Sequence, residues 1–281
     1  MLTNMKEELE KAKQNKYAIP HFNINNLEWT KFILEECNYK KSPVILGVSE
    51  SSVKYMGGYN TVSSMIIGLI KDLNIKVPVS LHLDHGTSVE SCIDAINANF
   101  TSVMIDLSKY SLEENIKNTK IVTDYAHSKN VIVEAEIGYI GKNKISKDTE
   151  YAKVNDAYKL VKETNIDLLA PALGSVHGFY KDKPNLDFKR MKEISLKTNL
   201  PLVLHGGSGI ADDLIKISIQ NGICKININT ELQFEWAKEV KSFIEQNPDI
   251  YDPRKIIKSG EIAIKNKISE KLILLGSMDK A

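Results

Sequence analysis

The sequence predicts an α/β protein built as a (β/α)8 TIM barrel with an additional C-terminal helix. Short apolar segments alternate eight times with longer amphipathic segments, which is typical of parallel βα units. A chain of 281 residues also has the length of one such barrel. The alternative is an open doubly wound sheet, which usually carries a glycine-rich nucleotide-binding turn after its first strand. Here the first strand continues into FNINN at 22–26, which contains no glycine.

No linker, low-complexity run or composition break interrupts the chain, so we expect residues 1–281 to form a single domain. The predicted strands span residues 17–23, 43–49, 77–84, 102–107, 131–138, 168–175, 200–205 and 224–230. The predicted helices between them span residues 27–41, 61–74, 89–98, 112–129, 155–164, 188–198, 212–221 and 231–246. A charged amphipathic helix is expected at the N-terminus, and one final helix over about residues 253–275.

Composition restricts the class of partner. The formal net charge of +1 argues against a nucleic-acid or membrane surface as the main partner. No apolar run approaches the roughly 20 residues of a membrane span, and the charged N-terminus lacks the apolar core of a signal peptide. The three cysteines are widely spaced and form no CxxC pair, which suits a reducing compartment. We therefore expect a cytoplasmic protein with a small-molecule substrate.

The third predicted strand carries the first catalytic signal. Ser80, His82 and Asp84 alternate with two leucines, so the strand has one polar and one apolar face. It ends on Asp84 and His85, which place a carboxylate beside an imidazole where the chain leaves the sheet. In a parallel barrel the strand ends of this kind form the active site, so Asp84 is a candidate acid/base residue.

Three of the six histidines lie at predicted strand ends, each next to a glycine: His85, His177 and His205. Three imidazoles that converge on one barrel mouth suit a catalytic zinc ion, which takes three protein ligands and keeps one position open. Of the others, His127 lies in a helix and is interpreted as a surface residue. His82 is expected to orient its neighbours, and His21 fits either the barrel interior or support of the ligands.

The last two βα loops suggest a phosphate site. Gly206, Gly207 and Ser208 precede a predicted helix, and glycine backbone N–H groups with a helix N-terminus can bind an anion. Strand eight places Asn227 and Asn229 on one face with Lys225, either to contact a ligand or as a polar layer inside the barrel. Asp106 ends strand four, and Glu134 and Glu136 share the inward face of strand five, where a divalent ion could pair them.

Together these motifs make the chain resemble the metal-dependent class II fructose-bisphosphate aldolases over essentially its whole length. The matching stretches are FNIN at 22–25, SPVIL at 42–46, LHLDHG at 81–86, SVMID at 102–106, VEAE at 133–136, APALGSVHG at 170–178, LVLHGGSG at 202–209, KININT at 225–230 and YDPR at 251–254. The resemblance implies zinc-dependent reversible cleavage of fructose 1,6-bisphosphate to dihydroxyacetone phosphate and glyceraldehyde 3-phosphate, in glycolysis or gluconeogenesis.

The resemblance also implies roles for individual residues. Asp84 matches the acid/base residue, and the three strand-end histidines match the zinc ligands. Asp106 and Glu136 match a second metal position, and a monovalent cation is a further cofactor that the family allows. Residues that match the dihydroxyacetone phosphate site are Gly178, Gly206, Gly207, Ser208, Asn227, Ile228, Asn229 and Thr230. Asn23 and Ser49 match substrate contacts, and Arg254 matches a residue that reaches the distal phosphate in a neighbouring subunit. A homodimer or homotetramer is therefore expected.

One segment departs from the family pattern. The loop after strand five usually contains a glutamate that moves a proton of dihydroxyacetone phosphate, but residues 138–150 here carry lysines, with Asp148 and Glu150 as the only acids. Tagatose 1,6-bisphosphate and a phosphorylated deoxy-ketogluconate are therefore alternative substrates. A Schiff-base aldolase that uses Lys225, and a non-catalytic phosphosugar-binding protein, are the rival functions.

Overall fold

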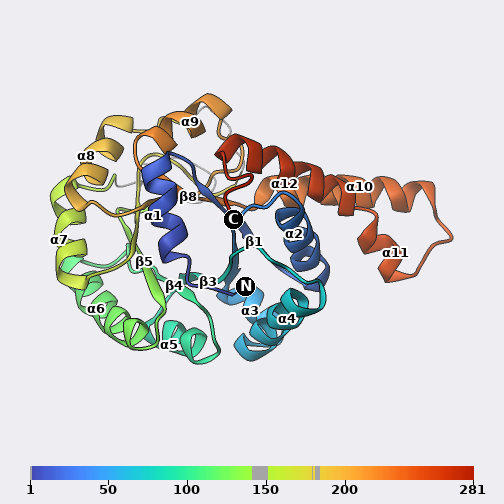
Figure 1. Ribbon diagram of the computed structural model, residues 1–281, viewed down its shortest axis with the longest axis horizontal. Helices are drawn as coiled ribbons and strands as arrows, with labels where there is room; N and C mark the ends of the chain where they lie inside the picture. Colours follow the sequence, from blue (N-terminus) through green and yellow to red (C-terminus); the bar gives the residue numbers. More distant parts are fainter. Residues whose placement is uncertain (1, 141–150, 179, 181–183) are drawn as a thin grey trace.

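The computed structural model describes residues 2–140, 151–178, 180 and 184–281. Its strands form a closed parallel barrel in which each strand pairs with the next along the chain and β8 pairs with β1 (Figure 1). The strands are β1 (Ile19–Asn23), β2 (Val44–Ser49), β3 (Val79–Gly86), β4 (Ser102–Ile105), β5 (Ile132–Ile137), β6 (Leu168–Pro171), β7 (Leu202–Leu204) and β8 (Ile223–Ile228). The predicted (β/α)8 barrel is confirmed.

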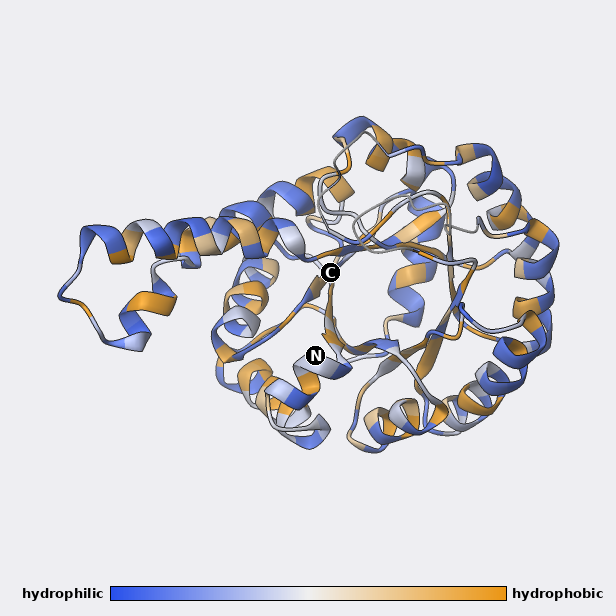
Figure 2. Ribbon diagram, turned by 180° about the vertical axis from the view of Figure 1, so that it is seen from behind, coloured by the Kyte–Doolittle hydropathy of each residue, from blue (hydrophilic) through white to orange (hydrophobic). Residues whose placement is uncertain are grey.

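Helices cover the outside of the barrel and turn their apolar residues toward it (Figure 2). They are α2 (Leu27–Tyr39), α3 (Glu50–Tyr55), α4 (Tyr59–Asp72), α5 (Val89–Asn97), α6 (Leu112–Ser128), α7 (Val154–Thr164), α8 (Phe188–Thr198), α9 (Asp212–Gln220), α10 (Thr230–Gln246) and α12 (Glu261–Leu275); the short helix α11 (Pro253–Lys258) lies away from the barrel. None of these described helices combines the length and apolar composition that crossing a bilayer requires.

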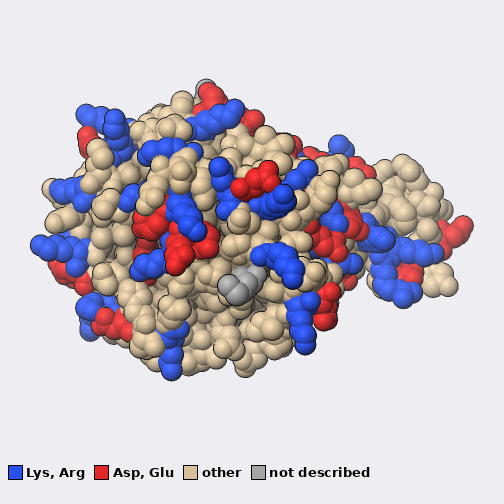
Figure 3. Space-filling view, in the orientation of Figure 1, with Lys and Arg blue, Asp and Glu red and all other residues tan. Residues whose placement is uncertain are grey.

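The N-terminal helix α1 (Lys6–Asn15) closes the end of the barrel where the strands begin. It lies across the barrel in front of the strands in Figure 1. Met5, Leu9 and Ala12 are buried there against side chains from the barrel interior, among them Ile19 and Ile132. The outer surface of this face carries acidic and basic side chains side by side (Figure 3). Since this end is closed by apolar packing, the barrel opens to solvent at the carboxyl ends of its strands.

The distal part of α10 and helix α11 form an arm that projects from the barrel, and α12 returns to pack on α2 and α9 (Figure 1). The predicted C-terminal helix is confirmed as α12, but its predicted start at residue 253 is wrong, because a separate helix, α11, ends at Lys258 and α12 begins at Glu261. The break coincides with Gly260, where a Cβ atom would lie only 2.2 Å from Cδ1 of Trp236. The Trp236 indole N–H donates to the carbonyl of Ile257 at 3.2 Å and so satisfies the end of α11.

Two other differences affect the site. Helix α3 was not predicted; the Ser49 hydroxyl caps it by accepting a hydrogen bond from the Ser52 N–H at 3.2 Å. Strands β6 and β7 end before the predicted boundaries, at Pro171 and Leu204. Glycines with left-handed backbone follow each of them, Gly174 at φ 98° and Gly206 at φ 66°, so the chain turns away from the sheet earlier than the apolar pattern suggests.

Candidate active site and metal centre

A cavity of about 480 Å³ opens at the carboxyl ends of the barrel strands. Most of the residues that the sequence singles out line it: Asn23, Ser49, Asp84, His85, Asp106, His177, Gly178, Gly206, Ser208, Asn227, Asn229 and Thr230. Sequence reasoning missed four polar residues that line the same cavity: Asn25, Ser51, Ser52 and Thr87. The polar run directly after strand two was the available signal for the serines.

A β-bulge lets two adjacent residues, Asp84 and His85, both reach this cavity. Neighbours on a regular strand point to opposite faces. Here the pairing of β3 with β4 shifts register between Leu83 and Gly86, and His85 has a left-handed φ of 54°. Such a conformation is uncommon and costs a non-glycine residue on the order of 1–3 kcal/mol. The bulge therefore aims the carboxylate and the imidazole at the same space.

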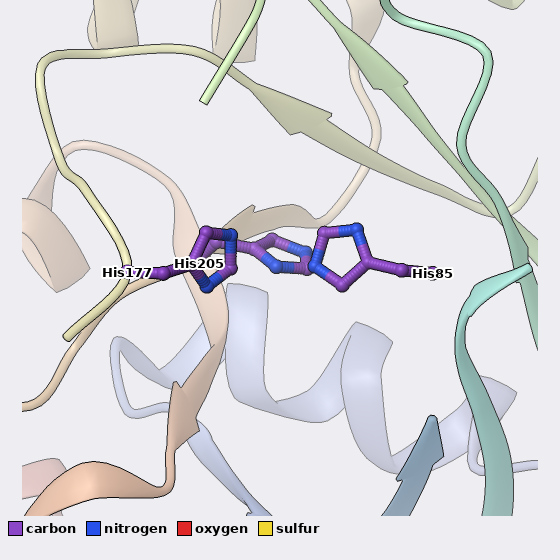
Figure 4. A group of neighbouring side chains, drawn as sticks. All are labelled: His85, His177 and His205. Atoms are coloured by element: carbon purple, nitrogen blue, oxygen red, sulfur yellow. The ribbon is translucent and has the colours of Figure 1, made fainter. Parts of the chain in front are cut away.

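The three strand-end histidines converge. Their rings point toward one another from β3 and from the loops after β6 and β7 (Figure 4). Ring centroids are 5.0 Å apart for His85 and His177, 4.7 Å for His85 and His205, and 5.7 Å for His177 and His205. One nitrogen from each ring lies within 4.8 Å of the other two.

Carboxylates orient two of these rings. His85 Nδ1 bonds Asp106 at 2.8 Å, which leaves His85 Nε2 buried and without a partner among the described residues. His205 Nε2 lies 2.9 Å from Glu134 Oε1, and because an ionised carboxylate only accepts, that nitrogen carries the proton. The lone pair of His205 is then on Nδ1. The nitrogen that is not bonded to a carboxylate, Nε2 of His85 and Nδ1 of His205, is then the one that would face a metal ion, as in other histidine ligands held by a carboxylate.

The pKa values of the three histidines differ, and each has a physical cause in the site. Burial, together with the two neighbouring imidazoles, lowers the pKa of His177 to about 3, so this ring is neutral. Burial also lowers the pKa of His205, although its bond to Glu134 opposes the shift. At His85 burial is outweighed by the bond to Asp106 and by nearby carboxylates, which raise its pKa to about 9. A metal ion at His85 therefore has to displace a proton.

A second set of donors adjoins the first. His85, Asp106 and Glu136 also bring ligand atoms within 4.8 Å of one another. Glu136 Oε2 is buried with no hydrogen-bond partner among the described residues, and burial with repulsion from Asp106 raises the pKa of Glu136 to about 8. A cation would relieve both penalties, so the donors present fit one divalent ion among the imidazoles and a second beside the carboxylates.

Asp84 is held from two sides. The Asn23 amide donates to Asp84 Oδ2 at 2.8 Å, and the Asn227 amide donates to Oδ1 at 3.2 Å. Burial alone would raise the pKa of Asp84, but the protonated His85 and the Lys225 ammonium group hold it well below the usual value. The carboxylate is therefore ionised and able to accept a proton.

Beneath the cavity, Glu134, Lys225 and His82 form a buried layer of charged and polar side chains. The sequence did not indicate that Glu134 is the central acid of this layer. Lys225 donates to Glu134 Oε2 at 2.6 Å, while the other oxygen bonds His205. His82 bonds Ser102 at 2.7 Å and approaches Lys225 at 3.4 Å. Since its ammonium group is paired with Glu134, Lys225 is not the free amine that a Schiff base requires. His127 lies outside this layer, on α6, where 31% of its side chain is exposed and Nε2 lies 2.8 Å from Asp167.

The glycine-rich loop after β7, residues 206–209, packs against the start of α10. Ser208 Oγ accepts hydrogen bonds from the N–H groups of Asn229 at 3.2 Å and Glu231 at 3.4 Å. The Tyr180 hydroxyl donates to the carbonyl of Gly206 at 2.8 Å and accepts from the N–H of Val176. Residues from two loops and the N-terminal end of a 17-residue helix therefore surround one side of the cavity, an arrangement that favours an anion.

Several predicted site residues lie elsewhere. Gly207 and Ile228 do not line the cavity; the Gly207 N–H donates to the carbonyl of Asn227 at 2.9 Å, and Ile228 is buried in the core. Arg254 lies on the arm, exposed, and is paired with Asp252 at 2.8 Å. Asp148 and Glu150, the only acids of the loop after strand five, lie outside the described residues.

The barrel carries an ionised carboxylate beside three converging imidazoles at the carboxyl ends of its strands. This arrangement is typical of TIM-barrel enzymes, and the imidazoles form a candidate metal centre. The family model for "Fructose-bisphosphate aldolase class-II" matches residues 3–280. The chain therefore belongs to the class II fructose-bisphosphate aldolase family, whose members are lyases, as the motifs predicted.

Individual relatives agree with this assignment. The chain is 50% identical to the fructose-bisphosphate aldolase of Geobacillus stearothermophilus over 283 residues, covering 100% of this chain and 99% of the relative. It is 49% identical to a 6-phospho-5-dehydro-2-deoxy-D-gluconate aldolase of Bacillus licheniformis, covering 99% and 96% of the two chains. The crystal structure of the YdjI aldolase from Escherichia coli K12 superposes with a TM-score of 0.87 at 34% identity, with 100% of both chains covered.

Proposed function

We propose that this protein catalyses the zinc-dependent, reversible aldol cleavage of fructose 1,6-bisphosphate to dihydroxyacetone phosphate and glyceraldehyde 3-phosphate, a step of glycolysis and gluconeogenesis. The observation that carries the proposal is the ionised Asp84 carboxylate beside three converging imidazoles. The name of the Geobacillus stearothermophilus relative supports the choice of substrate. In this proposal residues 1–281 act as one domain.

His85, His177 and His205 would hold the catalytic zinc ion, and Asp106 and Glu136 would hold a second divalent ion with His85. When bound, zinc would supply Lewis acidity for the ketose carbonyl and hydroxyl oxygens. The protein supplies the rest of the site: Asp106 and Glu134 orient two of the imidazole rings through the bonds described above. Three imidazoles with one open position are the ligand set that catalytic zinc takes.

Asp84 carries the proton in this proposal. In cleavage its carboxylate takes the proton of the C4 hydroxyl, the C3–C4 bond breaks, and the aldehyde is released. The electron pair stays on the carbon of the remaining fragment, and a proton from solvent water added to that carbon completes dihydroxyacetone phosphate. In condensation the same group returns the proton to the aldehyde oxygen. The amides of Asn23 and Asn227 each donate to one oxygen of Asp84 and fix its orientation for this transfer.

The phosphate of the dihydroxyacetone part is assigned to the glycine loop and the start of α10. Gly178, Gly206, Ser208 and Thr230 line this side of the cavity. Asn229 also lines it, and its Oδ1 is buried without a hydrogen-bond partner among the described residues. Backbone N–H groups and the helix N-terminus attract an anion, so the reacting carbons would be held in register with Asp84.

The distal group of the substrate would lie near Asn23 and Ser49. Among the described residues that line the cavity there is no lysine or arginine, although a bisphosphate carries a second phosphate. Basic side chains instead gather on the arm, where α11 carries Arg254, Lys255 and Lys258 (Figure 3). We therefore propose a homodimer or homotetramer in which Arg254 of one subunit faces the cavity of another.

The second candidate substrate is a phosphorylated deoxy-ketogluconate. The 6-phospho-5-dehydro-2-deoxy-D-gluconate aldolase of Bacillus licheniformis, at 49% identity, favours it. That compound differs from fructose 1,6-bisphosphate in its distal group, whereas tagatose 1,6-bisphosphate differs in stereochemistry. The three compounds share the phosphorylated part next to the ketone, so the residues around Asp84 serve each of them.

Metal analysis coupled to a cleavage assay on the three compounds tests the proposal. We expect about one zinc ion per catalytic site, loss of activity with chelator, and highest kcat/KM for fructose 1,6-bisphosphate. Asp84→Ala should lower kcat by at least about 100-fold, since general acid–base groups contribute roughly 10²–10⁴-fold. Cleavage that survives both chelation and Asp84→Ala would contradict the proposal, and binding without turnover by the zinc-loaded protein would indicate a phosphosugar-binding protein.

Arg254→Ala and Arg254→Lys test the shared site. If Arg254 contacts the distal phosphate, Arg254→Ala should raise KM for the bisphosphate by about tenfold or more, as expected for loss of a charge-assisted hydrogen bond of about 1.5–3 kcal/mol. Arg254→Lys should recover part of the loss. Lys258→Ala on the same short helix is the matched control. An oligomer with unchanged KM in Arg254→Ala would refute the role of Arg254.

A further inference from the structure

His21 is a buried polar side chain that the mechanism above does not use. It lies on β1, two residues before Asn23, and is completely buried. Neither ring nitrogen has a hydrogen-bond partner in the described part of the chain. An unsatisfied buried polar group costs about 1–3 kcal/mol, so packing alone does not explain an imidazole at this position.

The neighbouring strand is shaped to receive this ring. A Cβ atom on Gly47 of β2 would lie 1.7 Å from His21 Nε2 and 2.3 Å from its Cε1. Gly47 is not among the residues with positive φ, so its backbone conformation does not require glycine. The imidazole does require it, because any larger residue at 47 would occupy the position of the ring.

The ring edge faces the proposed acid/base residue. His21 Nε2 lies 3.9 Å from Asp84 Oδ1, on the oxygen that also accepts from Asn227. Burial, with the nearby charge of Lys225, keeps the pKa of His21 well below its usual value, so the ring is neutral and carries one N–H. At this separation the interaction with the carboxylate is electrostatic rather than a hydrogen bond.

A metal ion is the competing explanation for this group, because His21, His82 and Asp84 bring ligand atoms within 4.8 Å of one another. The surrounding contacts argue against it. His82 Nδ1 is bonded to Ser102 at 2.7 Å, and its Nε2 faces the Lys225 ammonium at 3.4 Å. His82 therefore has no nitrogen available, and an added cation would lie beside an existing buried cation.

We propose that His21 is a positioning residue for Asp84. Its neutral imidazole, seated against Gly47, presents the Nε2–H dipole to Asp84 Oδ1 and keeps the carboxylate in the orientation that the two asparagine amides define. The inference rests on the proposed role of Asp84 in proton transfer. It predicts that His21 affects turnover and not substrate binding.

Two substitutions of similar volume separate positioning from packing. His21→Leu fills the space but has no N–H, whereas His21→Gln keeps an N–H donor of comparable reach. We expect His21→Leu to lower kcat about tenfold, a part of the roughly 10²–10⁴-fold that general acid–base catalysis supplies, with KM within about twofold. His21→Gln should lose clearly less. Ile45→Val, at the position that pairs with His21 on β2, is the control for barrel packing and should leave kcat unchanged. Equal losses in the leucine and glutamine variants would refute the proposal.

Gly47→Ala tests the seat of the ring. Alone it should lower kcat as His21→Leu does, because the ring must move by more than 1 Å to clear a Cβ atom at 1.7 Å. His21→Ser leaves room for a Cβ atom at position 47. In that background Gly47→Ala should therefore lower kcat hardly any further than His21→Ser alone does. Additive losses in the double variant would show that the two residues act independently, which would contradict the proposed seat.

A measurement that does not depend on activity completes the test. Side-chain ¹⁵N spectra of the histidine-labelled, zinc-loaded protein should show His21 as the Nε2–H tautomer, and Asp84→Ala should change that signal. A wild-type Nδ1–H tautomer would overturn the inference and leave the proposed function intact. Failure of the proposed function would appear differently, as turnover retained in Asp84→Ala.

Discussion

Removing the charge of Glu134 should destabilise the barrel strongly, because this residue is the partner of a buried cation. Glu134 and Lys225 are both almost completely inaccessible to solvent and are joined at 2.6 Å. Burial opposes ionisation of Glu134, but Lys225 and His205 hold its pKa below the usual value, so the pair is charged. Glu134→Gln keeps the shape of the side chain and leaves the Lys225 ammonium unpaired.

The expected loss in free energy of unfolding is about 3–5 kcal/mol, the usual cost of breaking a buried ion pair by removing one partner. For a chain of this size each kcal/mol corresponds to about 2–4 °C in Tm, so Tm should fall by about 6–20 °C. Urea denaturation of the metal-free protein, followed by circular dichroism, measures the loss. Glu113→Gln, which changes an exposed glutamate paired with Lys159 on the surface, is the control and should stay within about 0.5 kcal/mol.

The double variant decides whether the pair is the cause. Lys225→Met removes the cation, so Glu134→Gln should cost much less in that background than in the wild type. If the proposed zinc ion is bound, Glu134→Ala should in addition weaken its binding by about 10–100-fold, because the variant removes the acceptor that orients His205. If the two single losses simply add in the double variant, the proposed buried pair is not what stabilises this part of the barrel.

Three further predictions follow from burial. The cysteines should not react with a thiol reagent in the native protein at pH 8 and should all react after unfolding, because burial raises their pKa values; they are Cys37, Cys92 and Cys224. Burial, together with the nearby Lys225, lowers the pKa of His82 to about 3. Below about pH 6.5 this histidine is therefore protonated in the unfolded chain but still neutral in the native protein. The unfolding free energy of the metal-free protein should therefore fall by about 1.4 kcal/mol per pH unit from this group as the pH drops toward 4, and His82→Gln should remove that part of the slope in urea titrations. Gly260→Ala should cost about 1–3 kcal/mol and change the fluorescence of Trp236, whereas Gly68→Ala, in a helix with open space around it, should be neutral or stabilising by up to about 1 kcal/mol.

The barrel itself could be predicted because its signal is local and repeated. Each βα unit carries its own apolar segment and amphipathic segment, so errors at single boundaries do not change the architecture. The break at Gly260 could not be predicted in the same way. It depends on Trp236, which is distant in the sequence and occupies the space that a Cβ atom would need. A helical pattern that continues through a glycine gives no indication of what packs against it.

Some residues of the candidate site could be predicted from the sequence in the same way, whereas their hydrogen-bond partners could not. His177 and His205 were found because each follows an apolar strand and precedes glycine, and parallel strands bring such ends together. The pairing of Glu134 with Lys225 joins residues on strands β5 and β8, and alternation along either strand alone shows only that each side chain points inward. Sequence patterns therefore identify which residues are inside the barrel and do not identify their partners.

The end of β3 shows why a local rule fails where function is concentrated. Strict alternation predicts that Asp84 and His85 point to opposite faces, yet both line the cavity, because the strand bulges and His85 adopts a φ of 54°. Histidine adopts this conformation more often than most non-glycine residues, but surrounding contacts must still offset a cost on the order of 1–3 kcal/mol. The bond from His85 to Asp106 is one such contact, and a metal ion held with His177 and His205 would be another. If His85 binds the proposed metal ion, that bond adds to the contacts that hold this conformation, and the local rule of alternation then fails at the residue that the proposed function needs.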